Sequence, residues 1–289
     1  MRVTWTDRVA VVTGAGSGIG RQLAYALGRR GCRLAISDID DAGLEQTRSG
    51  LVGSGVETFS TRLDVADRAA VESHAAEVHD HFGAVHQLYN NAGVGTGRRL
   101  REMSYDDLDR ILSINLWGVI HGTKAFLPHL ISSGDGYLIN ISSVNAFLAQ
   151  PGLSAYCASK FAVRGFTEAV RAEMIADRLP VKVVVVHPGG VRTNIATAAL
   201  AHARAAGHRV TAEDEHGTAF YNDKLLRADA GSVAEVIVTA VGRGRSRVIV
   251  GTHAHKIDVL TRLAPALAPR AAALVQRALS RADPPHRPG

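Results

Sequence analysis

The sequence predicts an α/β protein: a doubly wound parallel β-sheet with helices on both faces. Two observations predict it. Short apolar runs rich in β-branched residues alternate with longer segments of helical periodicity along most of the 289 residues, which is the pattern of strands joined by helical crossovers. A glycine-rich turn follows the first of these runs directly. Because no repeat or linker divides the chain, we expect one domain over residues 1–254, followed by a C-terminal helical extension over residues 255–289.

The expected strands are short, apolar and separated by helical segments. In chain order they cover residues 8–13, 33–37, 56–64, 86–90, 137–142, 181–187 and 247–251. The run VKVVVVH at 181–187 is almost wholly β-branched, so we expect it to be buried on both faces of the sheet.

The segments between these runs predict the helices. One follows the glycine turn and ends at Arg30, a short polar helix follows the second run, and an Ala-rich helix ends near Phe82. A long helix is expected over about 105–131 and another over about 155–179, with further helices in the tail.

The composition indicates a chain that folds around a sizeable core. Hydrophobic residues make up 46% of the sequence and charged residues 21%, a balance that excludes intrinsic disorder. The formal net charge is +6, but residues 243–289 hold nine Lys or Arg and two Asp or Glu, a balance of +7 that leaves −1 for residues 1–242. No aromatic residue lies among the basic residues of this tail, so we expect no nucleic-acid partner.

The expected environment is the cytoplasm. The N-terminal apolar run, Val9 to Val12, is too short for a signal-peptide core, and no stretch reaches the roughly 18 apolar residues of a membrane span. Cys32 and Cys157 lie too far apart to look like part of a disulfide framework and form no Cys/His cluster, so we expect no bound metal.

The first chemical signal is the turn TGAGSGIG at residues 13–20, between the first expected strand and helix. Glycines let the backbone approach a pyrophosphate closely, and the helix N-terminus supplies N–H groups and the positive end of a dipole. The spacing Gly-x-x-x-Gly-x-Gly departs from the common GxGxxG pattern, and a plain flexible turn is the alternative. The position after a strand and before a helix favours dinucleotide binding.

Asp38 ends the second expected strand, 18 residues after Gly20. A carboxylate there can accept hydrogen bonds from both hydroxyls of an adenosine ribose, and it repels a 2′-phosphate. The next three residues include no Lys or Arg to bind such a phosphate, so we expect NAD, with NADP as the alternative. A helix-capping role for Asp40 or Asp41 is the other interpretation of this acidic cluster.

Tyr156 and Lys160 are four residues apart in an expected helix, so they share one helical face. A free tyrosine has a pKa near 10, and a nearby cation favours its phenolate. Tyr156 is therefore a candidate proton donor or acceptor, although the YxxxK spacing alone also occurs by chance in many helices.

Further polar residues fall where expected strands end or inside an expected helix. Ser143 ends the fifth strand and 90–93 ends the fourth, both at the ligand edge of this fold. The Ser143 hydroxyl could polarise a carbonyl oxygen there. Asn115 lies inside the long helix, where asparagine is mildly disfavoured; a solvent-facing residue is the simpler interpretation.

Together and in this order, these residues resemble the short-chain dehydrogenase/reductase family, in its single-domain form with a TGxxxGxG turn and a YxxxK pair. The resemblance runs from about Asp7 to Thr193 and implies a Rossmann-like fold. It implies a catalytic tetrad of Asn115, Ser143, Tyr156 and Lys160. It also implies these cofactor-binding residues: Gly14, Ser17, Gly18, Ile19 and Gly20 at the diphosphate, Asp38 at the ribose, Asp64 and Val65 at the adenine, Asn91, Ala92 and Gly93 in the cleft, Tyr156 and Lys160, and Pro188, Gly189, Val191 and Thr193 at the nicotinamide. His187 stands where the family usually has asparagine.

The resemblance also implies the reaction. Hydride would pass between NAD(P) and a secondary alcohol or ketone, while Tyr156 exchanges a proton with the substrate oxygen and Ser143 hydrogen-bonds that oxygen. Lys160 would lower the pKa of the tyrosine and hold the nicotinamide ribose, and Asn115 would support a water that links Lys160 to solvent. A homodimer or homotetramer is expected. The rival interpretation is a non-catalytic dinucleotide-binding sensor or scaffold, against which stand all four tetrad residue types.

The substrate is expected to be an apolar small molecule. Apolar residues near the tetrad suggest such a pocket: Val144, Phe147, Leu148 and Leu153. In the family the segment after Thr193, here about 194–227, forms a lid over the substrate. Its histidines, His202, His208 and His216, are expected at the surface, and Phe220 and Tyr221 lie near its end.

The tail leaves two interpretations open. Ile257, Leu260, Leu263 and Leu267 keep helical spacing, which indicates one buried face. Packing on its own domain or on a neighbouring subunit is the first interpretation. Attachment to a membrane surface is the second, because arginine and leucine occur together as in interfacial helices. The final PPHRPG is expected to be disordered.

Overall fold

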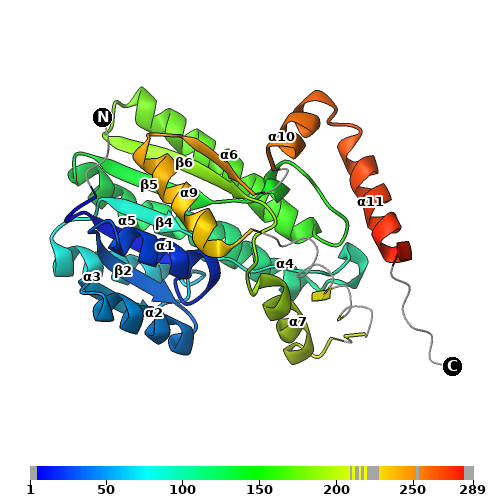
Figure 1. Ribbon diagram of the computed structural model, residues 1–289, viewed down its shortest axis with the longest axis horizontal. Helices are drawn as coiled ribbons and strands as arrows, with labels where there is room; N and C mark the ends of the chain where they lie inside the picture. The colour runs from blue at the N-terminus through cyan, green and yellow to red at the C-terminus, as the bar shows by residue number, and fades with distance from the viewer. Residues whose placement is uncertain are drawn as a thin grey trace.

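The protein is built on a seven-stranded parallel sheet with the strand order β3-β2-β1-β4-β5-β6-β7 (Figure 1). The computed structural model describes residues 5–208, 210–211, 215, 218–219, 228–251 and 254–282, with side chains as far as residue 277. The strands are β1 (Val9–Thr13), β2 (Arg33–Asp38), β3 (Thr58–Arg62), β4 (Gln87–Asn90), β5 (Gly136–Ile141), β6 (Val181–Pro188) and β7 (Arg247–Val250). Every neighbouring pair is parallel, which confirms the predicted fold class.

Helices connect the strands and cover both faces of the sheet. Those described are α1 (Gly18–Gly28), α2 (Asp41–Gly53), α3 (Arg68–Phe82), α4 (Tyr105–Leu112), α5 (Gly118–Ser132), α6 (Ser154–Ala176), α7 (Ile195–Ala205), α9 (Ala230–Gly242), α10 (Ala254–Leu263) and α11 (Ala268–Ala282). Three short helical turns are η1 (Leu100–Glu102), the π-helical η2 (Ser113–Trp117) and η3 (Val144–Ala146).

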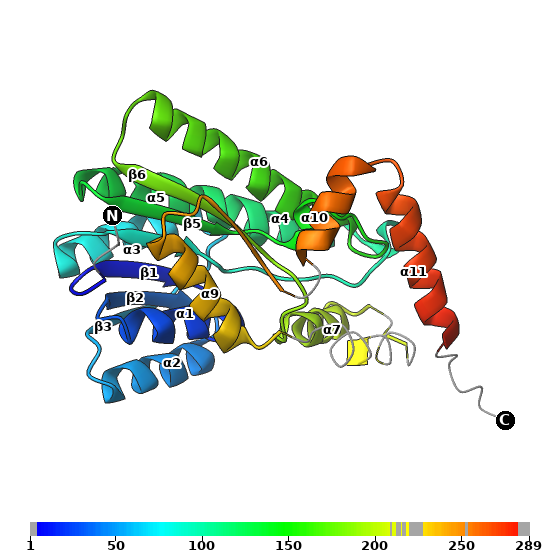
Figure 2. The same cartoon turned by 45° about the horizontal axis from the view of Figure 1, so that its top comes forward.

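Alternate residues of the strands face opposite helical layers, as the period of a strand requires. In β1, Ala10 and Val12 belong to the core formed with α1, α2 and α9, whereas Val9 and Val11 belong to the core formed with α3, α5 and α6. Figure 2 shows these two layers on either side of the sheet. The predicted burial of β6 on both faces is confirmed, apart from the exposed Lys182 at its beginning.

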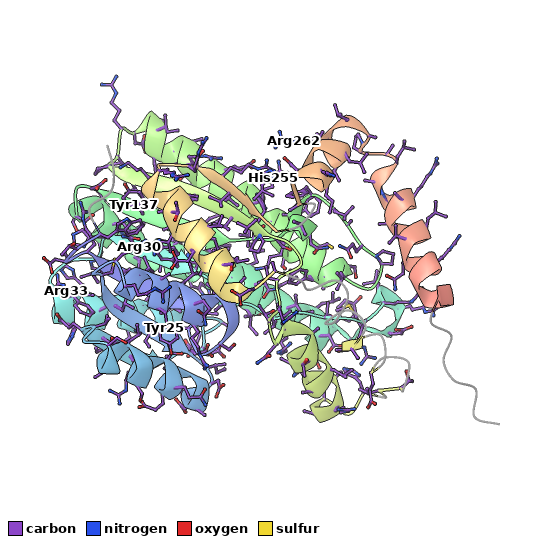
Figure 3. The ribbon with its side chains drawn as sticks, viewed as in Figure 1. Tyr25, Arg30, Arg33, Tyr137, His255 and Arg262 are labelled. Atoms are coloured by element: carbon purple, nitrogen blue, oxygen red, sulfur yellow. The ribbon has the colours of Figure 1, made fainter. Side chains whose placement is uncertain are left out.

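The strand order changes direction between β1 and β4, and this is where such sheets bind ligands, beyond the carboxyl ends of the strands. Arg33 and Tyr137 lie at or near the amino ends of β2 and β5. In Figure 3 both are far from His255 and Arg262 of α10, which lie at the opposite end of the molecule. The extension therefore lies on the side of the sheet to which the carboxyl ends of the strands point.

The structure departs from the sequence predictions in three helical regions. The single helix expected over 105–131 is divided into α4, a π-helical turn and α5. Asn115 lies on this wider turn and faces inward. The helix α9 was not predicted, and neither was α7 within the expected lid. Among the described helices none is long and apolar enough to cross a membrane.

Candidate active site

The glycine turn closes tightly against the ends of β4 and α1. Gly14 has φ +67°, and a Cβ built on it would lie 2.7 Å from the Ala92 Cα. A Cβ on Gly20 would lie 2.0 Å from the Gly14 carbonyl oxygen. Both positions therefore require glycine, which has no Cβ and adopts positive φ readily. The result is a compact turn at the N-terminus of α1, exposed at Ser17, where a helix N-terminus suits an anion.

The end of β4 holds this turn in place through Asn91 and Thr13. Asn91 Nδ2 donates to the carbonyl oxygens of Thr13 at 3.0 Å and Gly14 at 3.2 Å. Thr13 Oγ1 accepts from the backbone N–H groups of Asn91 at 3.0 Å and Ala92 at 3.1 Å. The side chain of Asn91 is thus committed to the shape of the turn, a role that the sequence analysis did not assign to it.

The segment after β6 meets the same turn from the other side. A Cβ on Gly18 would lie 3.3 Å from the Thr193 Cγ2. Ser17 is exposed at the N-terminus of α1, Ile19 is half-buried, and Pro188 is buried. The structure therefore brings the two ends of the implied cofactor site, residues 14–20 and 188–193, together.

Asp38 is tied directly to the glycine turn. Gly16 N–H donates to Asp38 Oδ2 at 2.7 Å, and Asp40 N–H donates to Asp38 Oδ1 at 3.0 Å. The Leu63 N–H donates to the Asp38 carbonyl oxygen at 2.9 Å, which brings the exposed Asp64 and the buried Val65 to the same edge. The Asp38 carboxylate, the glycine turn and residues 64–65 therefore lie together at one edge of the sheet.

The nearest basic side chain on α1 is already engaged. Arg21 Nε donates to Thr47 Oγ1 at 2.9 Å, and its guanidinium also donates to the carbonyl oxygens of Gly16 and Gly43 and to Gln46 Oε1. These bonds hold α2 against the turn. Arg21 thus links α1 and α2 to the glycine turn. Beside the turn, Asp38 contributes a negative charge.

Lys160 is buried at the opposite end of the implied site. Its side chain is 4% exposed, and Nζ donates to the Ile141 carbonyl oxygen at 3.1 Å. The same atom lies 5.8 Å from the centroid of the Tyr156 ring, as their spacing on α6 predicted. Burial lowers the pKa of Lys160 to about 8, because a charged group loses hydration inside the protein.

Asn115 is fully buried, which excludes the simpler alternative of a solvent-facing residue. It lies on the π-helical turn and bonds both polar backbone groups of Val94: Oδ1 accepts from N–H at 2.8 Å, and Nδ2 donates to the carbonyl oxygen at 2.9 Å. A Cβ on the exposed Gly93 would lie 3.2 Å from Asn115 Oδ1 and 3.5 Å from Lys160 Nζ. The absence of a side chain at Gly93 thus lets its backbone lie close to both side chains.

Ser143 follows β5 and is buried together with Asn145. Its Oγ accepts from the Asn145 N–H at 3.1 Å and lies 3.3 Å from Asn145 Oδ1. Asn145 Nδ2 in turn contacts the Cys157 Sγ at 3.7 Å, next to Tyr156 in the chain. Sequence reasoning missed Asn145, whose only signal was its place two residues after a polar strand end.

His187 supports Ser143 from β6. Its Nδ1 lies 3.0 Å from the Ser143 carbonyl oxygen, which can only accept, so Nδ1 carries the proton and donates. Burial lowers the pKa of His187 to about 4, so the ring is neutral at pH 7. His187, which stands where the family usually has asparagine, therefore makes one hydrogen bond to the Ser143 backbone.

Val144 and Phe147, which were expected near an apolar pocket, are both buried. They form a small buried cluster with Ala254 of α10, against which Ile257 packs. Leu148 and Leu153 are half-buried. Val144 and Phe147 thus form the surface on which α10 of the C-terminal extension packs.

A cavity of about 30 Å³ lies between the loop after β4, α4 and α7. Its lining includes Gly95 and Arg98 of the loop, Asp107 and Arg110 of α4, and His202 of α7. Gly95, in the lining of this cavity, directly follows Val94, whose backbone binds Asn115. Charged and polar side chains at its wall were not predicted.

The lid is joined to α4 by a histidine. His208 Nε2 lies 3.1 Å from Asp107 Oδ1, so this histidine, expected at the surface, is half-buried and paired with a carboxylate. The carboxylate was missed because it comes from a distant helix. His216, Phe220 and Tyr221 lie outside the described residues.

Comparison with known proteins gives one consistent result. A family model described as short chain dehydrogenase matches residues 8–204. A putative oxidoreductase, SadH, of Mycobacterium tuberculosis is 47% identical over 261 residues, which cover 90% of this chain and 92% of that protein. A 1-deoxy-11-beta-hydroxypentalenate dehydrogenase of Streptomyces avermitilis is 33% identical over 216 residues, covering 74% and 79% of the two chains. The crystal structure of a short chain dehydrogenase/reductase from Burkholderia phymatum in complex with NAD superposes with a TM-score of 0.81 at 28% identity, covering 99% of each chain.

Proposed function

This chain belongs to the short-chain dehydrogenase/reductase family of oxidoreductases, and from that premise we propose that it transfers hydride between a nicotinamide dinucleotide and a small-molecule secondary alcohol or ketone. One observation carries the proposal: the buried ammonium of Lys160 lies beside the ring of Tyr156, with Asn115 and the exposed Gly93 next to it. A buried lysine with a lowered pKa is costly to stability and is typical of a functional site.

The residues present fit a dinucleotide. Gly14 and Gly18 at the turn and Gly93 beside Lys160 carry no side chain that would hold a ligand away from the backbone. The N–H groups of the α1 N-terminus suit the diphosphate, and the ammonium of Lys160 suits a ribose hydroxyl near the nicotinamide. When bound, the nicotinamide supplies the hydride acceptor or donor. The NAD complex of the Burkholderia phymatum neighbour supports this assignment.

We propose NAD rather than NADP as the preferred cofactor. Asp38 directs a carboxylate to the end of β2, where Gly16 N–H fixes Oδ2. A 2′-phosphate would meet this negative charge, and Arg21 is engaged in bonds to α2 and the turn rather than available to it. A ribose with both hydroxyls intact instead finds an acceptor in the carboxylate.

Proton exchange is assigned to Tyr156. An alcohol must lose its hydroxyl proton as hydride leaves its carbon, and the phenolate of Tyr156, stabilised by the Lys160 ammonium, can accept it. In the reverse direction the phenol returns the proton to the carbonyl oxygen. Ser143 would hold the same oxygen, with its own position set by Asn145 and His187. Asn115 orders the loop at Val94, and both Asn115 and Lys160 lie close to Gly93.

The proposed substrate is a small molecule with an apolar body. The half-buried Leu148 and Leu153 lie in the segment that leads into α6, and the relative from Streptomyces avermitilis is named as a dehydrogenase of a hydroxypentalenate. The cavity wall with Arg98 and Arg110 adds a charged region beside this apolar one.

The test is a panel of alcohols and ketones with NAD(H) and with NADP(H), followed by absorbance of the reduced nicotinamide. We expect turnover of at least one apolar secondary alcohol or its ketone, with a higher kcat/KM for the NAD couple. Tight binding of the dinucleotide without turnover of any panel member would favour the sensor interpretation instead.

A further inference from the structure

The C-terminal extension is turned so that its apolar residues face away from the enzyme. On α10 the buried residues are Ala254, Asp258 and Thr261. Leu260 and Leu263, which the sequence analysis placed on the buried face, are 52% and 81% exposed. Leu267 is exposed as well, and only Ile257 of the predicted set is partly buried. Against the chain's own domain, three of the four residues predicted to share a buried face are therefore exposed, and burial against a neighbouring subunit stays a prediction.

An ion pair sets this rotation of α10. Arg247 of β7 binds Asp258 in a bidentate pair, with distances of 2.8 and 2.7 Å, and Arg262 adds a third contact at 3.1 Å. The ring of Phe147 lies under the Arg247 guanidinium at 5.6 Å. The pairing compensates the charge of the buried Asp258, and with Asp258 on the buried side, Leu260 and Leu263 lie on the opposite side of α10.

The next helix repeats the arrangement. On α11, Leu274 and Val275 are 63% and 59% exposed, whereas Ala268 is buried and Ala272 half-buried. Large apolar side chains are thus exposed on α11 as they are on α10. We call the exposed residues Val259, Leu260, Leu263, Leu267, Leu274 and Val275 the tail face; they are six of the fourteen large hydrophobic residues exposed in the described part of the chain.

The charge beside the tail face has one sign. Arg270 and Arg277 are exposed and seven residues apart, hence on one side of α11, next to Leu267 and Leu274. The sequence of α11 contains no acidic residue. The described side chains of α10 and α11 include four basic residues, Lys256, Arg262, Arg270 and Arg277, and one acidic residue, Asp258, so the formal charge of the two helices is positive.

The exposed leucines and arginines of the tail face together indicate which kind of partner it binds. A second copy packed through α11 would bring arginines toward arginines with no carboxylate of α11 to compensate. A nucleic acid would satisfy the arginines but leave the leucines in water. An anionic lipid surface satisfies both, because acyl chains take the apolar side chains and headgroup phosphates take the guanidinium groups.

We propose that the tail face binds the surface of a membrane containing anionic phospholipids, as a peripheral contact that does not span the bilayer. In Figures 1 and 2, α10 and α11 lie at the same end of the molecule as α7, and α10 packs on η3, which Ser143 caps. The contact therefore lies at the end of the molecule that carries the site.

The test is sedimentation of the full-length protein with vesicles, at low and at high salt. One set of vesicles mixes phosphatidylglycerol with phosphatidylcholine, and the other is phosphatidylcholine alone. The apolar variant carries Leu274→Gln and Val275→Gln, and the charge variant carries Arg270→Gln and Arg277→Gln. Matched controls remove equally exposed side chains elsewhere: Val52→Gln with Val236→Gln, and Arg68→Gln with Arg101→Gln.

The wild-type protein should sediment with the anionic vesicles at low salt and much less at high salt. Binding should weaken more than about tenfold in the apolar variant and about fivefold for each arginine lost, with both controls unchanged. All the replaced side chains are exposed, and circular dichroism should confirm folding.

Three outcomes would overturn the proposal. The wild type could fail to sediment with anionic vesicles. The apolar variant could bind as well as wild type, which would reduce the effect to unspecific attraction of basic residues. Finally, the apolar variant could have fewer subunits by sedimentation equilibrium while the wild type ignores vesicles, which would make the tail face an interface between copies.

Discussion

Lys160 and Tyr156 share one side of α6, with the lysine Nζ 5.8 Å from the centroid of the tyrosine ring. The lysine reaches this place through the interior, where the Ile141 carbonyl oxygen accepts its hydrogen bond at 3.1 Å. Burial lowers its pKa to about 8, so it remains mostly charged at pH 7. The fold thus keeps a cation beside a phenol at a cost in stability, and that cost can be measured.

The first prediction concerns the pH dependence of stability in the protein without cofactor. The pKa of Lys160 falls from 10.5 to about 8 on folding, so between these values the unfolded chain binds more protons than the native one. The unfavourable contribution is complete below pH 8 and is relieved as pH rises toward 10.5. In Lys160→Met this dependence is absent.

Urea unfolding of the wild type and Lys160→Met at pH 7 and pH 10 measures the effect. The wild type should gain about 2–3 kcal/mol relative to the variant over this interval. Parallel curves for the two proteins would mean that Lys160 is not buried as a cation.

The second prediction concerns the cofactor preference. Asp38→Ala should weaken NAD binding by about 1–3 kcal/mol, the range for hydrogen bonds to a charged group, while NADP binding weakens less or improves because the repulsion of its phosphate is lost. Asp40→Ala is the matched control, since it removes a carboxylate two residues away. Dissociation constants from fluorescence titration check both. An unchanged NAD/NADP ratio in Asp38→Ala would remove the role of this carboxylate.

The third prediction compares two glycines. Gly14→Ala should destabilise the protein by about 1–3 kcal/mol and abolish dinucleotide binding, because its φ is +67° and a Cβ would meet Ala92. Gly165→Ala should stabilise it by about 0.5–1 kcal/mol, because Gly165 lies inside α6 and a Cβ there meets nothing within 4 Å. Thermal unfolding measures both; a neutral Gly14→Ala would show that the turn is not closed as described.

The fourth prediction concerns the ion pair of the extension. Hydrogen bonds from Arg247, and then from Arg262, lower the pKa of Asp258 from 3.8 to about 2. Its stabilising contribution is therefore present above about pH 4 and is lost as pH falls through 2. Asp258→Asn should cost about 1.5–3 kcal/mol at pH 7, and the difference from wild type should shrink on acidification.

The control for Asp258 is its exposed second partner. Arg262→Gln removes a surface contact, so it should cost less than about 1 kcal/mol. Denaturant unfolding at pH 7 and pH 3 measures the three proteins. Equal losses for Asp258→Asn and Arg262→Gln would contradict the central place of the Arg247 pair.

The sequence was sufficient for the sheet and for the positions of the chemical groups, because both follow from local patterns. Strand periodicity, the glycine turn and the four-residue spacing of Tyr156 and Lys160 each act within a few residues. What failed depended on distant partners. Asn115 turns inward because Val94, 21 residues away in the chain, offers both backbone groups, and no helical pattern reports that.

The extension shows the same limit. Its leucine spacing indicated a buried leucine face, but α10 buries Asp258 against its own domain instead. Asp258 forms an ion pair there with Arg247 of β7. Likewise His208 has a carboxylate partner on α4, 101 residues away. Hydrophobic pattern alone does not include the electrostatics of a partner that is far along the chain.

The measurement that tests the account most directly is the turnover of Tyr156→Phe on a substrate identified from the panel, alongside Tyr105→Phe, whose ring is 85% exposed. The ring still packs in the variant, but the exchangeable proton is gone. We predict that Tyr156→Phe lowers kcat by about 10²–10⁴-fold, the usual contribution of general acid–base catalysis, while the Kd for NAD stays within about threefold and Tyr105→Phe is unchanged. A Tyr156→Phe enzyme with wild-type kcat would contradict the account.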